Sequence, residues 1–380
     1  MDFLSSKESE MKMEKKKGEK KPLRVGTLFS GIGAFEQALK QLKIKHEIVF
    51  ACDNGERYLK QTEDEIREQA KGLGFKTKDE LEKFVDDLYE KTGKPNFVKQ
   101  SYFANYDITE DRWHNDVRFM DGAQYKGKVD ILVGGSPCQS FSVMGKHAGL
   151  EDTRGTLFYD YARIIRESQP SVFIFENVPG MLIHDKGRTW NVIKSVFESL
   201  NYKIHYQVLD AKDYGIPQNR KRLFVVGLKN KDSNFVFPEK KKLTTTLFDY
   251  LETDISEEFY LGEKGFAFVT DPSHPNRTHV NCNIAKTQKA NQQFNWNGDF
   301  IFEELDKKHT PSILKRAYVG QWHAKKGVAR KLTNRECLRL MGFSDSFKIV
   351  VPSMQSYRQS GNSIVVNVLK SIIANLREEI

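Results

Sequence analysis

The fold is set by the stretch LRVGTLFSGIGAFEQALKQL, residues 23–42, which predicts a short buried strand, a glycine turn and an amphipathic helix. The segment EIVFACD, residues 47–53, predicts a second strand that ends in an acid. Further strands are predicted at VDILVGG, SVFIFENV, YKIHYQVL and KRLFVVGL, with helical stretches between several of them. Strands that alternate with helices indicate an α/β fold with a doubly wound, mostly parallel sheet over roughly residues 23–230.

The pattern outside this sheet predicts three further parts of the chain. Residues 1–22 are lysine-rich and lack the apolar centre of a signal peptide, so they predict a disordered basic leader. The large domain spans 23–234 and contains a charged, helix-favouring insertion at about 55–112. The alternation stops over 235–330, which predicts a separate smaller domain. The segment 331–380 ends in an amphipathic helix that we expect to pack back on the large domain.

Composition narrows the class of protein. Sixty Lys and Arg residues against 51 Asp and Glu residues give a net charge of +9, which is compatible with a polyanionic partner. No apolar run reaches the roughly 18 residues that a membrane span needs. The cysteines are scattered without a CxxC pair, which predicts no metal site, no disulfide framework and a cytoplasmic location. They are Cys52, Cys138, Cys282 and Cys337.

The first turn, FSGIGAFE, suits the close approach of a ligand. Gly31 and Gly33 allow the backbone to pass near a bound nucleoside, and the following helix offers free N–H groups. A dinucleotide fingerprint would place a third glycine where Glu36 stands, so the turn alone is a weak signal. Asp53 stands where an acid would bind ribose hydroxyls, although an ordinary strand-end acid that caps the next turn would look the same.

Reactive side chains follow the later strands. Cys138 comes just after VDILVGG, at the sheet edge where such folds bind their ligands. Glu176 and Asn177 lie near the end of SVFIFENV, while Arg220 and Arg222 alternate in YGIPQNRKRLFVVG, at the start of a later strand, and therefore share one face. A lone cysteine is usually inert, and the glutamate and arginines could form structural ion pairs. Their joint placement at strand ends favours a catalytic site.

The motifs PCQ, ENV and QNRKR, after FSGIG and before RECLRLMGF and GNSIVVNVL, resemble the ordered motif set of bacterial DNA cytosine-C5 methyltransferases of the restriction-modification type. The resemblance runs from about Leu23 to the C-terminus. It implies a Rossmann-like, S-adenosylmethionine-dependent catalytic domain, and a target-recognition domain over 235–330. It also implies that a cytosine of double-stranded DNA is flipped into the pocket, because its ring is inaccessible within the stack.

The resemblance assigns roles to the candidate residues. The Cys138 thiolate would add to C6 of cytosine, and Glu176 would stabilise the charge that develops near N3. Arg220 and Arg222 would hold the base carbonyl and neighbouring phosphate or carboxylate groups. The expected cofactor-binding residues are Phe29, Ser30, Gly31, Ile32, Gly33, Asp53, Asp116, Pro137, Leu157, Asn362, Ser363 and Val365. The expected DNA contacts are Gln139, Ser142, Met144, Lys146, Gln292, Gln293, Asn295, Lys315, Arg316, Gln321 and Lys326.

The sequence departs from the family pattern at two positions. Asn54 stands where relatives often carry an aromatic that packs on adenine, and Met144 replaces a small polar residue near the extruded base. Neither change affects the nucleophile, the glutamate or the arginines.

The resemblance also implies partners. We expect no metal, a monomer on DNA, pairing with a cognate restriction endonuclease, and a bacterial, nucleoid-associated protein.

Other classes of protein fit the sequence less well than a DNA cytosine-C5 methyltransferase. An amino-group methyltransferase would carry a Pro-Pro-aromatic motif, which is absent, and a nicotinamide dehydrogenase would leave PCQ, ENV and QNRKR unexplained. A non-catalytic binding protein and an RNA-methylating relative remain as alternatives.

Overall fold

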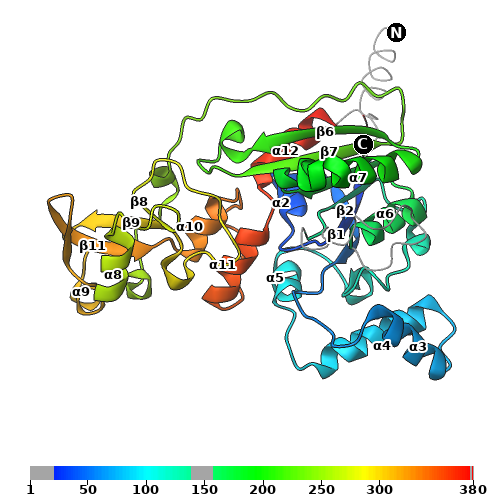
Figure 1. Ribbon diagram of the computed structural model, residues 1–380, viewed down its shortest axis with the longest axis horizontal. Coiled ribbons are helices and arrows are strands. Elements are labelled where there is room, and N and C mark those ends of the chain that lie inside the picture. The colour runs from blue at the N-terminus through cyan, green and yellow to red at the C-terminus, as the bar shows by residue number, and fades with distance from the viewer. Residues whose placement is uncertain (1–20, 138–156, 377–378, 380) are drawn as a thin grey trace, which may run out of the picture.

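A seven-stranded sheet forms the centre of the larger lobe in the computed structural model, which describes residues 21–137, 157–376 and 379 (Figure 1). Its strand order is β3-β2-β1-β4-β5-β7-β6. The strands are β1 (Leu23–Leu28), β2 (His46–Cys52), β3 (Trp113–His114), β4 (Ile131–Gly134), β5 (Val172–Asn177), β6 (Lys203–Asp210) and β7 (Lys221–Leu228). The pairs from β3 to β5 are parallel, whereas β7 runs antiparallel to both β5 and β6. The predicted doubly wound, mostly parallel sheet is therefore confirmed.

Helices cover both faces of this sheet because its strands are apolar on both sides. In β5, Val172 and Ile174 belong to one core cluster, and Phe173 and Phe175 belong to the other. The first cluster is completed by α2 (Ala34–Gln41) and α12 (Val366–Asn375), and the second by α6 (Leu157–Ser168) and α7 (Arg188–Ser199). The C-terminal helix thus packs in the same layer as the first helix of the chain.

The charged insertion folds into helices at one end of the larger lobe (Figure 1). They are α3 (Glu63–Gly72), α4 (Lys78–Lys91) and α5 (Phe97–Asn105). Capping boxes begin both α3 and α4, at Thr62 and Thr77. The pair α3–α4 has a small apolar core of its own, which also includes Phe119 from the strap that follows β3.

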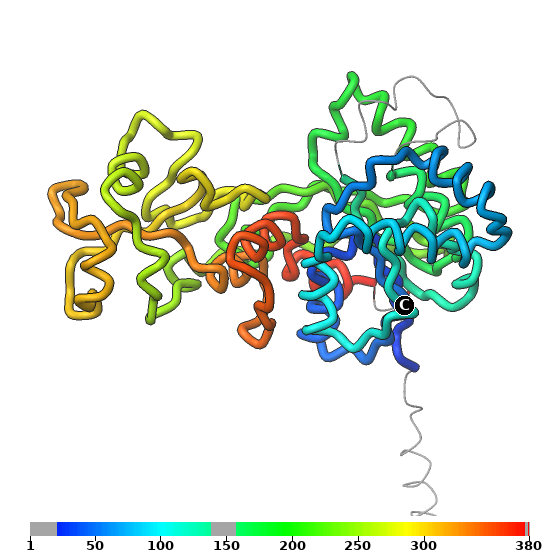
Figure 2. The backbone as a smooth tube through the Cα atoms, turned by 90° about the horizontal axis from the view of Figure 1, so that it is seen from below, coloured from blue at the N-terminus to red at the C-terminus, as the bar shows by residue number. Residues whose placement is uncertain are grey.

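A four-stranded sheet, in the order β10-β11-β9-β8, forms the smaller lobe. Its strands are β8 (Thr278–Val280), β9 (Gly298–Glu304), β10 (Gly320–Trp322) and β11 (Lys325–Lys331), and its helices are α8 (Glu263–Thr270) and α9 (Pro311–Arg316). The segment from residue 331 divides between the lobes: α10 (Asn334–Arg339) shares an apolar cluster with Ile301 of β9, whereas α12 packs on the larger sheet. Between them, α11 (Ser353–Asn362) lies at the junction of the lobes (Figure 2).

A buried ion network attaches α10 to the smaller sheet. Arg330 of β11 binds Glu336 of α10 through two hydrogen bonds, at 2.9 and 3.0 Å, and Glu303 of β9 at 2.7 Å. Glu336 also accepts the main-chain N–H groups of Thr333 and Glu252, so its buried charge is fully hydrogen-bonded.

Within the described ranges, no helix is long and apolar enough to cross a membrane.

Candidate active site

An ion pair joins two neighbouring strands at the edge of the sheet where the candidate residues lie. Glu176 lies next to the last residue of β5 and Arg222 lies near the start of β7, with Nε of the arginine 3.0 Å from Oε1 of the glutamate. Both side chains are largely shielded from solvent, at 15% and 18% exposure. Burial raises the pKa of Glu176, while Arg222 and Arg220 lower it less strongly. A carboxyl group in this setting can keep a proton that an exposed glutamate would release.

The turn that leads to Cys138 passes directly over this pair. A Cβ on Gly135 would lie 2.4 Å from the Glu176 carbonyl oxygen and 3.0 Å from its Oε2, so the backbone approach requires glycine. Asn177 donates from Nδ2 to the Ser136 carbonyl at 2.9 Å and fixes the turn. The sequence placed Asn177 at a strand end without a role, and this anchoring role depends on the fold. Pro137 is exposed, and Cys138 lies outside the described residues.

Arg220 is placed differently from Arg222. Its guanidinium is buried, and it donates from Nη1 to the Gln288 carbonyl at 2.7 Å and from Nη2 to the carbonyls of Gly361 and Ser363 at 3.0 and 2.7 Å. Burial, together with Arg222, lowers the pKa of Arg220 to about 9. Its Nη1 and Nη2 groups bind carbonyls of the smaller lobe and of the α11 end, whereas its buried Nε has no hydrogen-bond partner among the described residues. The expectation that both arginines hold the substrate stays a prediction. Arg222 alone lies in contact with Glu176.

The glycine turn of the expected cofactor site has an unusual backbone. Phe29, Gly31 and Gly33 all have positive φ, at 53°, 54° and 73°. Asp53 holds this turn, because its Oδ2 accepts the Gly31 N–H at 2.9 Å and its Oδ1 accepts the Gly55 N–H at 2.8 Å. Burial raises the pKa of Asp53, against the effect of these two amides. The acid therefore caps its own turn while standing beside the glycines.

The remaining expected cofactor residues differ in their surroundings. Asp116 is buried beyond β3, where it accepts three hydrogen bonds from the Arg118 guanidinium, one from the Arg118 main-chain N–H and one from the Tyr89 hydroxyl at 2.8 Å. Asn362 is exposed and donates to Glu56 Oε1 at 2.6 Å. The others differ in exposure. Ile32, Ser363 and Val365 are buried, and Ser30 and Leu157 are half-buried.

The expected DNA contacts fall into three groups. Gln292 and Gln293 are buried and turn their amides inward, to Ser360 Oγ at 2.8 Å and to the Asp299 carbonyl at 2.9 Å, so we withdraw them as base contacts. The exposed candidates are Asn295, Lys315, Arg316, Gln321 and Lys326. Those that lie outside the described residues are Gln139, Ser142, Met144 and Lys146.

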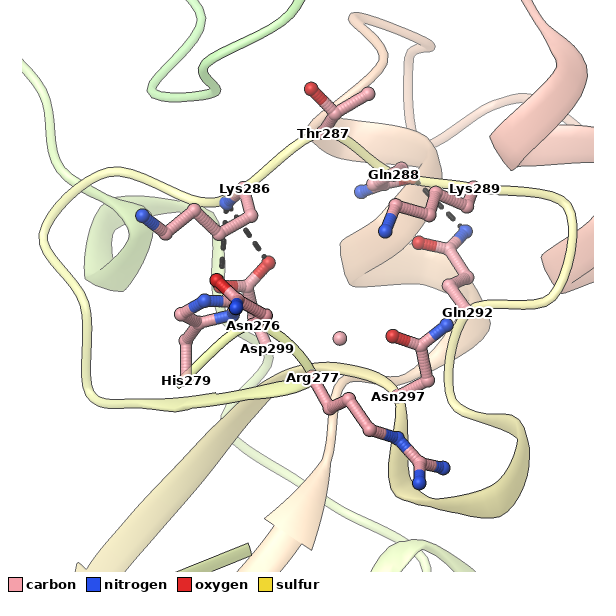
Figure 3. A pocket seen from close by; sticks show the side chains of 11 residues that line it. Asn276, Arg277, His279, Lys286, Thr287, Gln288, Lys289, Gln292, Asn297 and Asp299 are labelled. Carbon is pink, nitrogen blue, oxygen red and sulfur yellow. Dashed lines mark hydrogen bonds between the residues drawn. The ribbon is translucent and has the colours of Figure 1, made fainter. Parts of the chain in front are cut away.

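The smaller lobe contains a small pocket with a basic rim, about 30 Å³ in volume (Figure 3). The cations on its lining are Arg277, Lys286 and Lys289, and all three are exposed. The rest of its lining is mostly polar, comprising Asn276, His279, Thr287, Gln288, Gln292, Asn297, Gly298 and Asp299. Sequence reasoning missed the three cations, although they flank the amide-rich stretch that it singled out.

The model of the C-5 cytosine-specific DNA methylase family matches residues 23–378. The chain belongs to this family. It is thus a DNA cytosine-5 methyltransferase, as the motif resemblance predicted.

Curated relatives agree with this membership. The chain is 38% identical to Type II methyltransferase M.SsoII of Shigella sonnei over 73% of its own length and 70% of the relative's. It is 38% identical to Type II methyltransferase M.HhaI of Haemophilus parahaemolyticus over 65% of its own length and 75% of the relative's.

Solved structures share the fold at low sequence identity. The Spodoptera frugiperda DNMT2 structure matches with a TM-score of 0.64 at 18% identity, covering 93% of this chain and 99% of that one. The Entamoeba histolytica methyltransferase EhMeth matches with a TM-score of 0.62 at 15% identity, covering 94% and 99%.

Proposed function

We propose that the chain methylates C5 of a cytosine flipped out of a specific short duplex sequence, through a covalent bond between Cys138 and C6 of the base. The Glu176–Arg222 pair carries this proposal, because it stands at the carboxyl end of β5 beneath the turn that leads into Cys138. A partly desolvated carboxyl group beside a guanidinium suits the polar edge of cytosine, where N3 accepts a proton and the carbonyl accepts N–H groups.

The chemistry follows from these side chains. The Cys138 thiolate adds to C6, and the displaced π electrons move through C5 toward N3, where protonated Glu176 donates a hydrogen bond. The electron-rich C5 then takes the methyl group. Loss of the C5 proton to a base restores the C5–C6 double bond and expels Cys138 as a thiolate. Arg222 orients Glu176 and donates to the base carbonyl, while Arg220 is assigned to bracing the two lobes.

The described residues fit S-adenosylmethionine, which when bound supplies an electrophilic methyl group on sulfonium sulfur. No heavy atom outside the local chain lies within 4 Å of the position that a Cβ would take on Gly31, so the turn is open on that side. Asp53 and Asp116 supply carboxylates for ribose hydroxyls and the adenine amine. The other members of the proposed site are Phe29, Ser30, Ile32, Gly33, Pro137, Leu157, Asn362, Ser363 and Val365.

We assign duplex binding to the smaller lobe. Arg277, Lys286 and Lys289 on the rim of its pocket are exposed cations that suit phosphates, and Asn276 and Asn297 supply amides that suit base edges. The exposed candidates of the sequence complete this proposed surface, namely Asn295, Lys315, Arg316, Gln321 and Lys326. Pairing with a restriction endonuclease belongs to the same proposal, because the two relatives reported above are Type II methyltransferases. Action as a monomer on DNA is proposed with it.

Expression in a methylation-free bacterial host, followed by base-resolution mapping of 5-methylcytosine in its genome, tests the proposal. A single short motif carrying the mark is expected, and Cys138→Ala should erase the mark while retaining duplex binding in vitro. Methylation that persists in this variant would refute the covalent mechanism. An unmarked genome together with transfer of labelled methyl groups to RNA would refute the assignment of the substrate.

A further inference from the structure

One face of α4 contacts three consecutive residues at the end of β3. Asn115 donates from Nδ2 to Asp86 Oδ1 at 2.9 Å, and the Tyr89 hydroxyl donates to Asp116 Oδ2 at 2.8 Å. Side chains four and three positions apart on a helix lie along one face, so a single helix can follow the strand end residue by residue. The three pairs, in order along the helix, are Glu82–His114, Asp86–Asn115 and Tyr89–Asp116.

Tyr89 connects this strand end to the loop that follows β2. Its side chain is fully buried, and the Arg57 guanidinium lies 4.7 Å from the centre of its ring. Arg57 in turn donates to Asn115 Oδ1 at 2.7 Å and to the Asn54 carbonyl at 3.0 Å. The loops that carry Asp53 and Asp116 are thus joined directly, by Arg57 and by the hydrogen bond from the Asp53 N–H to the His114 carbonyl at 3.0 Å. Tyr89 packs against Arg57 and binds Asp116, so it contacts both loops.

These polar contacts exceed what packing of the insertion requires. The α3–α4 pair already buries an apolar core of its own, which includes Phe84 and Val85. A phenylalanine at position 89 would fill the same volume without the need to satisfy a buried hydroxyl. The hydroxyl adds a further donor to Asp116 Oδ2, beside the guanidinium and main-chain N–H of Arg118, and so ties that carboxylate to α4.

We propose that α4 is a positioning element for the adenosine end of the cofactor site, with Tyr89 as its central positioning residue. The inference rests on the proposed function, in which Asp53 and Asp116 bind the cofactor. By contacting both acid-bearing loops, α4 supports their direct contacts and holds the Asp116 carboxylate in place before the ligand arrives. Preorganisation of this kind raises affinity because less order has to be imposed on binding. It also gives a function to the charged, helix-favouring insertion predicted at about 55–112.

The test is Tyr89→Phe, measured by calorimetric binding of S-adenosylhomocysteine and by steady-state methylation of DNA. Loss of one hydrogen bond to a charged group should weaken the affinity for S-adenosylhomocysteine about five- to tenfold. The KM for S-adenosylmethionine should rise in parallel, while kcat and the affinity for the duplex stay within about twofold of wild type. This KM-specific effect separates positioning from general damage.

Tyr202→Phe is the matched control. Tyr202 is also buried, and its hydroxyl donates to the Pro170 carbonyl at 2.6 Å, away from the strand ends that carry the acids. It should lower the melting temperature to a similar degree and leave cofactor affinity unchanged. Asp86→Ala, at a half-buried position, is the second variant should Tyr89→Phe not fold, and it should weaken S-adenosylhomocysteine binding about threefold.

The outcomes are distinguishable. The positioning role would be overturned if Tyr89→Phe, or Asp86→Ala in its place, bound S-adenosylhomocysteine with wild-type affinity. It would also be overturned if Tyr89→Phe and Tyr202→Phe lost equal affinity. Either result would leave the proposed function intact. Failure of the wild-type chain to bind S-adenosylhomocysteine at all would overturn the proposed function, and this inference with it.

Discussion

Asp299, on the floor of the pocket in the smaller lobe, should make the stability of the protein depend on pH near neutrality. Its side chain is buried, and its two oxygens accept only the Lys286 N–H among the described residues, at 3.1 and 3.3 Å. Burial raises the pKa of Asp299 to about 7 from its ordinary value of 3.8, and the Lys286 amide and ammonium oppose this only weakly. The folded chain therefore retains a proton that the unfolded chain releases.

The sign and size of the effect follow from this shift. The contribution of a carboxyl group with a raised pKa is greatest below its unfolded pKa and is lost as the pH rises toward its folded pKa. Each pH unit between the two values costs about 1.4 kcal/mol, so the penalty should grow by about 2.5 kcal/mol between pH 5 and pH 8. Asp299→Asn removes the charge and keeps an oxygen that accepts the Lys286 N–H.

Urea unfolding at intervals from pH 5 to pH 8 measures this penalty. The free energy of unfolding of Asp299→Asn should exceed that of wild type by an amount that widens as the pH rises and levels off above pH 7. The exposed Asp254→Asn in the same lobe is the control and should follow the wild-type curve. Parallel curves for wild type and Asp299→Asn would refute the reasoning, because they would mean that the buried group does not titrate in this range.

Three further predictions concern the proposed site. Glu176→Gln should lower kcat by about 100-fold or more with unchanged affinity for S-adenosylhomocysteine. The rate of the wild-type enzyme should fall as the pH rises through the raised pKa of Glu176, and this fall should be absent in the variant. An unimpaired rate in Glu176→Gln would refute the catalytic role of Glu176. Arg220→Lys keeps the charge but loses part of the bonding to three carbonyls, so chemical unfolding should show a loss of about 2 kcal/mol, and unchanged stability would contradict the bracing role. Arg277→Ala should weaken duplex binding in a fluorescence titration and reduce the salt dependence by about one phosphate contact, whereas an unaltered salt slope would place that cation off the DNA.

Local patterns in the sequence were sufficient for the sheet. The apolar strands, the glycine turn and the amphipathic helices each depend on residues within a few positions of one another, which is why their type was predictable. The motif order was equally readable, since it lies along the chain, and it identified the family without any knowledge of contacts. The sequence did not reveal that β7 inserts antiparallel between β5 and β6, because strand order depends on pairing between distant segments.

The candidate site shows the same division. Glu176 and Arg222 were predicted as partners in catalysis, and they lie 3.0 Å apart. Arg220 received the same role from its motif, but the fold buries it against carbonyls of Gln288 and Gly361, which lie far along the chain. Gln292 was predicted from the sequence to contact bases, yet in the fold its amide is buried and donates to Ser360 Oγ.

By itself, the sequence determined the fold class, the family and the chemical identity of the reactive groups, because these are encoded in local periodicity and in ordered motifs. Only the tertiary structure decided which groups are buried, which donors are already committed and which carboxylate α4 contacts. The physical reason is that hydrogen bonding and desolvation act through space. A side chain's partners, and with them its pKa and its availability to a ligand, are therefore fixed only when distant segments come together.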